Sequence, residues 1–167
     1  MKKIFWLPVA TVMITVVFTA CLKSDDTTSC TNNTLAQDQH IIDSFAAVSG
    51  LELTWDSDNY LYYQVMDPGT GSTPTSDSLV AFTWVGTTMS GTQFTSYTAS
   101  TATYSLSYYD NSLLTYALTK LQEGGSIKII FPSSVSYGCS ATTVNNVTIP
   151  GNSQIVYDIS LTDVANP

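Results

Sequence analysis

The sequence contains no arginine, a single histidine and few charged residues of either sign. Its five basic residues are all lysines, and they stand against 13 acidic residues, so the formal net charge of the 167 residues is -8. Nucleic-acid binding and charge-driven attachment to anionic lipid both need clustered basic side chains, so the composition excludes nucleic acid as a partner. We favour a structural, solvent-facing role for His40 over a metal-binding or catalytic one, and we expect no metal and no cofactor.

Apolar and hydroxyl-bearing residues make up most of the composition, in place of charged residues. Charged residues make up only 11% of the chain, whereas apolar residues make up 44% and include ten tyrosines. The length suits one domain with its own core and short extensions. This composition is typical of a β-rich extracytoplasmic domain.

The first 20 residues have the features of an export signal. Lys2 and Lys3 precede a long apolar run, which ends in small residues directly before Cys21. The segment VFTAC is similar to the lipobox of bacterial lipoproteins. This similarity implies removal of residues 1–20, lipidation of Cys21 and a lipid anchor in the bacterial cell envelope, at the outer membrane. The alternative is an uncleaved membrane anchor, since the run is nearly long enough to span a bilayer.

Two cysteines remain if Cys21 carries lipid. Residues 21–33 are short, polar and acidic, which predicts a flexible tether that contains Cys30. Export permits a disulfide between Cys30 and Cys139, which would join the start of the domain to a loop near its end. Two unpaired thiols are the alternative, and the sequence leaves both open.

A helical extension is expected over residues 34–57. Thr34 and Gln37 fit a capping box, and Gly50 supplies a stop signal. The apolar residues at helical spacing, which we expect to form the buried face, are Ile41, Phe45 and Val48.

The pattern changes to strands in the main domain, expected over residues 58–167. We expect strands at 60–66, 77–86, 91–97, 102–107, 126–131 and 153–164. Gly91 can supply the positive φ of the tight connection between the second and third strands. One helix begins near Ser112, follows the spacing of Leu114, Ala117, Leu118 and Leu121, and stops at Gly124-Gly125. Strands around a single helix predict an α+β fold with an antiparallel sheet.

Four segments of this domain resemble a known family. They are LYYQVMDPGTG, VGTTMSGTQFTS, LTKLQEGGSIKIIFPSSVSYG and IPGNSQIVYDISL. In this order and at this spacing they are similar to the FKBP-type peptidyl-prolyl cis-trans isomerases, over residues 60–164. The resemblance implies a twisted antiparallel sheet wrapped around one short helix. It also implies isomerisation of Xaa-Pro bonds without a nucleophile, metal or cofactor.

The resemblance also assigns residues to the site. It implies catalytic roles for Phe94, Thr95 and Tyr137, and it implies substrate-binding roles for Trp84, Asn111, Leu114, Ile149 and Tyr157. Thr95 stands where the family has an aspartate, Leu114 stands where it has the tryptophan floor of the proline pocket, and residues 139–148 are unusually polar. The alternative for the strand residues is that they only fill the core.

These departures from the family pattern predict a weak isomerase. The expected partners are proline-containing segments of exported proteins, with the membrane reached through the N-terminal lipid. One alternative is a catalytically inactive FKBP-like module that binds peptide or protein. Another is a structural lipoprotein subunit without a pocket.

Overall fold

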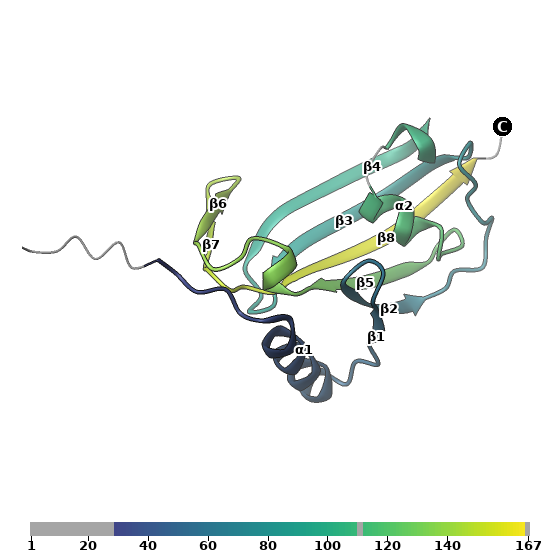
Figure 1. The fold of residues 1–167 in the computed structure, drawn as a ribbon. Helices are drawn as coiled ribbons and strands as arrows, with labels where there is room; N and C mark the ends of the chain where they lie inside the picture. Colours follow the sequence, from purple (N-terminus) through teal and green to yellow (C-terminus); the bar gives the residue numbers. More distant parts are fainter. Residues whose placement is uncertain (1–28, 110–111, 166–167) are drawn as a thin grey trace, which may run out of the picture.

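The computed structural model describes residues 29–109 and 112–165 (Figure 1). The helices are α1 (Leu35–Ser49) and α2 (Ser112–Leu118), and two 3-10 turns lie at Leu106–Tyr108 and Ser133–Val135. The strands are β1 (Thr54–Asp56), β2 (Leu61–Asp67), β3 (Leu79–Thr88), β4 (Gln93–Ser105), β5 (Ser126–Phe131), β6 (Thr142–Val144), β7 (Val147–Ile149) and β8 (Ile155–Ala165). The expected signal peptide, the lipidation site Cys21 and the expected pocket residue Asn111 lie outside the described residues.

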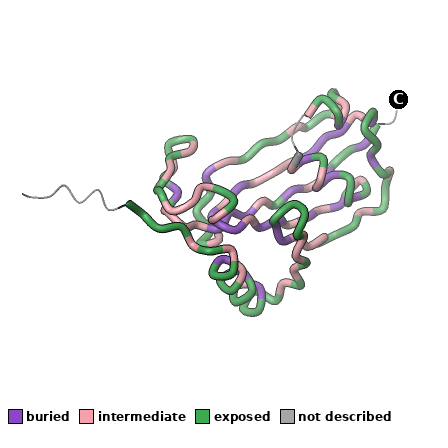
Figure 2. Tube along the Cα trace, in the orientation of Figure 1, coloured by how far each residue is buried: buried purple, intermediate pink, exposed green. Residues whose placement is uncertain are grey.

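Six strands form one antiparallel sheet in the order β1-β2-β5-β8-β3-β4. The C-terminal strand β8 therefore lies between β5 and β3, where it is paired on both sides. Helix α2 crosses one face of the sheet, over β3 and β8 (Figure 1). Buried residues alternate with more exposed ones along much of these strands (Figure 2). This arrangement is the α+β, FKBP-like architecture expected from the sequence.

Alternate residues of the strands face two different apolar clusters. Leu61 and Ile129 join the main core under α2, whereas their chain neighbours Tyr62 and Ile130 join a second cluster around Ile42 of α1. Because successive strand residues point to opposite faces, α1 covers the face of the sheet opposite α2. The expected boundary at residue 58 falls after β1, which already pairs with β2 and belongs to the sheet.

Helix α1 has the caps that the sequence predicts, but it buries a different face. The capping box of Thr34 and Gln37 is formed, and Gly50 takes the left-handed conformation at the C-terminus. The buried residues are Asp38, Ile42 and Ala46. Two members of the expected face are exposed, Ile41 at 37% and Val48 at 91%. The expected face was wrong because hydrophobicity alone places Asp38 on the solvent side of the helix. Asp38 is instead buried, and hydrogen bonds satisfy its carboxylate.

Three other elements differ from expectation. The expected strand at 102–107 is not separate, because β4 continues to Ser105 through shifts in its register with β3. Helix α2 ends at Leu118, and the buried Leu121 lies after the short turn that follows the helix. The polar segment 139–148 forms most of the hairpin β6–β7, whose turn residues Asn145 and Asn146 have φ of 49° and 64°. Positive φ at both central residues is the signature of a type I′ hairpin turn.

The N-terminal segment is tied to the domain by a disulfide. Cys30 and Cys139 are bonded, with their Cα atoms 5.5 Å apart and a separation of 109 positions in the sequence. Of the two alternatives that the sequence left open, the structure has the bridge. Within residues 29–109 and 112–165, no helix is long and apolar enough to cross a membrane.

Candidate active site

An open, largely apolar pocket of about 270 Å³ lies where β5, β8 and the start of α2 meet. Its lining consists of Leu113, Phe131, Val135, Ser136, Tyr137, Ile155 and Tyr157. The strands supply the aromatic wall, and the segment after Pro132 supplies Val135, Ser136 and Tyr137. This volume is slightly below the roughly 300 Å³ at which small-molecule sites begin, so it suits one or two residues of a peptide.

The aromatic rings of the site pack edge to face around Tyr157. The ring centroid of Tyr157 lies 6.2 Å from both Phe131 and Phe94, at interplanar angles of 86° and 79°. Phe94 in turn lies 6.2 Å from Tyr137 at 88°. Such pairs contribute about 0.5–1.5 kcal/mol each beyond the area they bury, so the rings fix one another in position.

Phe94 and Ile149 support the pocket from behind. Both are buried, and they form an apolar cluster with Ile155, against which Tyr137 and Tyr157 pack. Neither residue is part of the pocket lining. The site therefore contains Tyr137 and Tyr157 on its surface, with Phe94 and Ile149 as the layer beneath them.

Trp84 also lies one layer behind the pocket. Its ring is 5.6 Å from Tyr157 and 6.4 Å from Tyr97. Its indole Nε1 is buried, and it has no hydrogen-bond partner among the described residues. Trp84 therefore stabilises the ring of Tyr157 by packing.

Gly86 allows three strands to approach closely beside the pocket. It pairs with Thr95 on β4 and with Tyr157 on β8. A Cβ atom at this position would lie 2.5 Å from Thr95 Cγ2, 2.9 Å from Tyr157 Cε1 and 3.1 Å from Phe94 Cζ. Carbon atoms normally pack at about 3.5–4.0 Å, so no side chain fits here without moving the aromatic wall.

The residue at the floor of the pocket is Leu113, one position before the expected Leu114. Leu114, the expected floor, is 4% exposed and belongs to the main core. Leu113 instead lines the pocket, and it also lines a smaller adjacent cavity of about 70 Å³ together with Phe131. Both residues are apolar and lie at the start of α2, so the sequence pattern does not distinguish them.

The described lining of the pocket carries no charge. Among residues 29–109 and 112–165, no carboxylate and no basic side chain lines it. Burial, together with the neighbouring Tyr137, raises the pKa of Tyr157 to about 12, so its phenol stays protonated at neutral pH. Thr95, which stands where the family has an aspartate, is partly buried on β4. Within the described residues, no group of three or more His, Cys, Asp or Glu could hold a metal ion.

Sequence reasoning missed several residues of the site. Phe131, Val135 and Leu113 line the pocket, and Asn145 donates a hydrogen bond from its Nδ2 to the backbone oxygen of Phe94 at 3.1 Å. This bond fastens the β6–β7 hairpin beside the aromatic wall. The Asn-Asn pair at 145–146 is a hairpin signal that could have predicted this turn.

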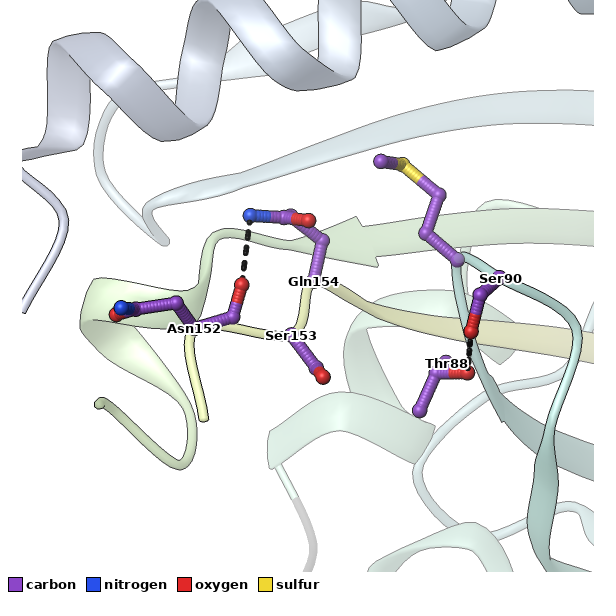
Figure 3. A pocket seen from close by; sticks show the side chains of 6 residues that line it. Thr88, Ser90, Asn152, Ser153 and Gln154 are labelled. Carbon is purple, nitrogen blue, oxygen red and sulfur yellow. Dashed lines mark hydrogen bonds between the residues drawn. The ribbon is translucent and has the colours of Figure 1, made fainter. Parts of the chain in front are cut away.

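A second pocket of about 310 Å³, lined mostly by polar residues, lies at the tip of the β3–β4 hairpin (Figure 3). Its lining consists of Thr88, Met89, Ser90, Asn152, Ser153 and Gln154. Thr88 and Ser90 share a hydrogen bond of 2.8 Å, and Gln154 Nε2 donates to the backbone oxygen of Asn152 at 3.2 Å (Figure 3). Met89 also packs against the cluster around Ile42, so this pocket adjoins the contact with α1.

Fold and pocket together define a known class of protein. The model of the FKBP-type peptidyl-prolyl cis-trans isomerase family matches residues 70–162, more than half of the chain. The chain therefore belongs to the FKBP-type peptidyl-prolyl cis-trans isomerase family. The match includes α2, the aromatic wall and Tyr137, whereas α1 lies outside it.

Individual relatives agree with this assignment. The chain is 31% identical over 126 residues to the FKBP-type peptidyl-prolyl cis-trans isomerase FkpA of Escherichia coli K12, which covers 73% of this chain and 43% of that protein. It therefore spans less than half the length of this relative. The crystal structure of FkpA from Escherichia coli superposes with a TM-score of 0.52 at 26% identity, covering 78% of this chain and 58% of that one. A peptidyl-prolyl cis-trans isomerase from Pseudomonas syringae pv. tomato DC3000 has the same fold, with a TM-score of 0.51 at 21% identity, covering 81% of this chain and 99% of that one.

Proposed function

We propose that the protein is a slow peptidyl-prolyl cis-trans isomerase that assists the folding of exported proteins. The observation that carries the proposal is the largely apolar pocket with the aromatic residues Phe131, Tyr137 and Tyr157 in its lining. The disulfide between Cys30 and Cys139 supports an oxidising, extracytoplasmic location.

The chemistry of proline isomerisation suits such a pocket. Rotation about an Xaa-Pro bond must break amide resonance, whose barrier is roughly 18–20 kcal/mol. The planar amide is more polar than the twisted one, so a largely apolar site favours the twisted state over the planar one. The pocket would hold the proline ring against Tyr157 and Phe131, and the Tyr137 hydroxyl is one donor that could bind a peptide carbonyl.

The residue at the floor explains why we expect slow catalysis. Leu113 covers less of a proline ring than an indole would, and every ~1.4 kcal/mol of lost transition-state stabilisation lowers the rate tenfold. Because Leu113 lies between two cavities, a larger side chain has room there. Leu113→Trp should therefore raise kcat/KM several-fold, whereas Leu114→Trp should overpack the core and destabilise the protein by about 1–3 kcal/mol.

Acceleration of cis-trans exchange in a short Xaa-Pro peptide, followed by NMR, tests the proposal. We expect Tyr137→Phe to lower kcat/KM about tenfold, the value of one hydrogen bond. Tyr108→Phe is the matched control, because Tyr108 is an exposed tyrosine outside the pocket lining. A wild-type rate equal to that of buffer at high protein concentration would reject catalysis.

A second candidate function is a non-catalytic module that binds proline-containing peptides. Thr95 in place of the family's aspartate and the aliphatic floor at Leu113 favour it. Peptide binding that depends on Tyr137, without any acceleration of exchange, would identify this function. Thr95→Asp should raise the exchange rate only if the protein is an isomerase.

We also propose a lipid anchor on Cys21 in the bacterial cell envelope, at the outer membrane. The sequence has three cysteines, and Cys30 and Cys139 are used in the disulfide, which leaves Cys21 as the remaining thiol. Mass spectrometry of the mature N-terminus tests this proposal. Cys21→Ser should abolish the lipid adduct and the processing at residue 21, whereas an intact Met1 in the wild-type protein would contradict processing.

A further inference from the structure

Residues 30–38, here called the N-terminal strap, lie against the loop that carries Tyr137. The strap ends in the first turn of α1, and it lies outside the segment that matches the family. The Tyr137 loop, residues 132–139, forms no strand pairs and contains one 3-10 turn at Ser133–Val135. Its position therefore depends on what it is fastened to.

Asp38 fastens the beginning of this loop. Its carboxylate is fully buried, and it accepts hydrogen bonds from Ser133 Oγ at 2.8 Å and 3.0 Å and from the Ser134 backbone N–H at 2.8 Å. Two further bonds of 2.9 Å come from Gln154 Nε2 and Asn33 Nδ2. A buried carboxylate is tolerated only when it is satisfied in this way. Burial alone would raise the pKa of Asp38, but these donors outweigh it and lower the pKa, so the group is ionised at neutral pH.

The strap also fastens the end of the loop. Cys30 forms the disulfide to Cys139, and Asn32 Oδ1 accepts a hydrogen bond from the Cys139 backbone N–H at 2.8 Å. Within the loop, the Gly138 N–H donates to the Ser133 oxygen at 2.9 Å. Tyr137 is therefore held between two anchors, and both come from the strap.

We infer that the strap is part of the isomerase site, with Asp38 and the Cys30–Cys139 disulfide as positioning residues for Tyr137. This inference rests on the proposed function. The loop supplies Val135, Ser136 and Tyr137 to the pocket. A shift of about 1 Å in a residue that binds the substrate can lower a rate up to about 10²-fold.

A double-mutant cycle between Asp38 and Tyr137 tests the inference. Asp38→Asn keeps the size of the side chain but points an amide donor at groups that are themselves donors, so the loop should loosen. We expect kcat/KM for an Xaa-Pro peptide to fall about tenfold in this variant. In the Tyr137→Phe background, the same change should cost less than twofold, because the hydroxyl that Asp38 positions is already missing. Asp163→Asn, an exposed carboxylate on β8, is the matched control.

Equal, additive losses in both backgrounds would mean that Asp38 acts through general stability, and they would overturn the inference. If Asp38→Asn does not fold, Ser133→Ala removes only the hydroxyl donor, and it enters the same cycle. The paired replacement of Cys30 and Cys139 by serine tests the second anchor, with a loss of kcat/KM that again depends on Tyr137.

Hydrogen exchange gives a readout that does not need activity. In Asp38→Asn, amides of residues 134–139 should exchange at least tenfold faster, while those of β5 stay protected. Unchanged protection of residues 134–139 would refute the strap as their anchor. A wild-type protein that binds peptide without catalysis would reject only the isomerase proposal, and peptide Kd would then replace kcat/KM in the cycle.

Discussion

The substitution Gly86→Ala tests whether the aromatic wall depends on close strand approach. Gly86 lies on β3, which is paired with β4 on one side and with β8 on the other. The added methyl would lie 2.5 Å from Thr95 Cγ2 and 2.9 Å from Tyr157 Cε1. Since strands on both sides hold β3 in register, the clash must be relieved by displacement of these side chains.

The size of the effect follows from these distances. Both contacts are about 0.6–1.5 Å shorter than the 3.5–4.0 Å at which carbon atoms pack well. Overpacking of this kind lowers the free energy of unfolding by about 1–3 kcal/mol. We expect about 2–3 kcal/mol here because the added methyl clashes with two neighbouring side chains. For a domain of this size, that corresponds to a Tm lower by roughly 8–12 °C. Displacement of Tyr157 should also lower kcat/KM about tenfold, because this ring lines the pocket.

Thermal unfolding followed by circular dichroism, together with the Xaa-Pro exchange assay, measures both effects. Thr95→Ser removes the Cγ2 atom that clashes, so the double variant Gly86→Ala with Thr95→Ser should recover at least about 1 kcal/mol relative to additivity. The reasoning is refuted if Gly86→Ala changes stability by less than about 0.5 kcal/mol and leaves kcat/KM intact.

Three further predictions concern the N-terminal contacts. Because its native pKa is depressed, Asp38 stabilises the fold above about pH 4, and this contribution is lost as pH falls through the lower native pKa. The free energy of unfolding in urea should therefore change less between pH 6 and pH 3 in Asp38→Asn than in the wild type. Equal changes in both proteins would contradict this. Ile42→Ala should lower the free energy of unfolding, measured in urea, by about 2–5 kcal/mol because the Ile42 side chain is fully buried. Val48→Ala on the exposed face should change it by less than about 0.5 kcal/mol. Similar losses for both variants would disprove the observed orientation of α1. Reduction of the Cys30–Cys139 bridge should lower the free energy of unfolding by about 2–5 kcal/mol, and an unchanged urea midpoint would count against the disulfide as a stabilising link.

Local signals in the sequence were sufficient for many elements of the fold. The capping box at Thr34 and the positive φ of Gly91, 95°, are set by residues within one turn, and both are present. Strand β5 has the predicted bounds because Gly125 and Pro132 stop it on either side. The order of these elements and the family motifs were enough to predict the α+β architecture.

The orientation of α1 could not be predicted from local signals. Asp38 is polar, so hydrophobic periodicity places it on the solvent side of the helix. It is buried because Ser133, Ser134 and Gln154, about 95–116 residues away, converge on its carboxylate. No spacing within the helix contains this information, which comes from the packing of three distant segments.

The residue at the pocket floor also could not be predicted from local signals. Leu113 and Leu114 are identical neighbours, and successive residues of a helix point about 100° apart. The sequence motif can therefore place a leucine at the floor but cannot decide which of the two faces the pocket. The decision depends on how α2 lies across β3 and β8, because this sets Leu114 in the core and leaves Leu113 beside Phe131.

The two departures from the family pattern act on different terms of catalysis. Replacement of the aspartate by Thr95 removes a charge, and a rotating amide loses polarity as it twists, so a neutral wall can still favour the twisted state. Replacement of the tryptophan by leucine removes surface that holds the proline ring, and no neighbouring residue has to move to restore it, since Leu113 borders a cavity of about 70 Å³. The floor should therefore limit the rate more than the missing carboxylate does. On this reasoning Leu113→Trp raises kcat/KM more than Thr95→Asp, and the opposite order would show that the field of a carboxylate, rather than contact with the ring, is what this pocket lacks.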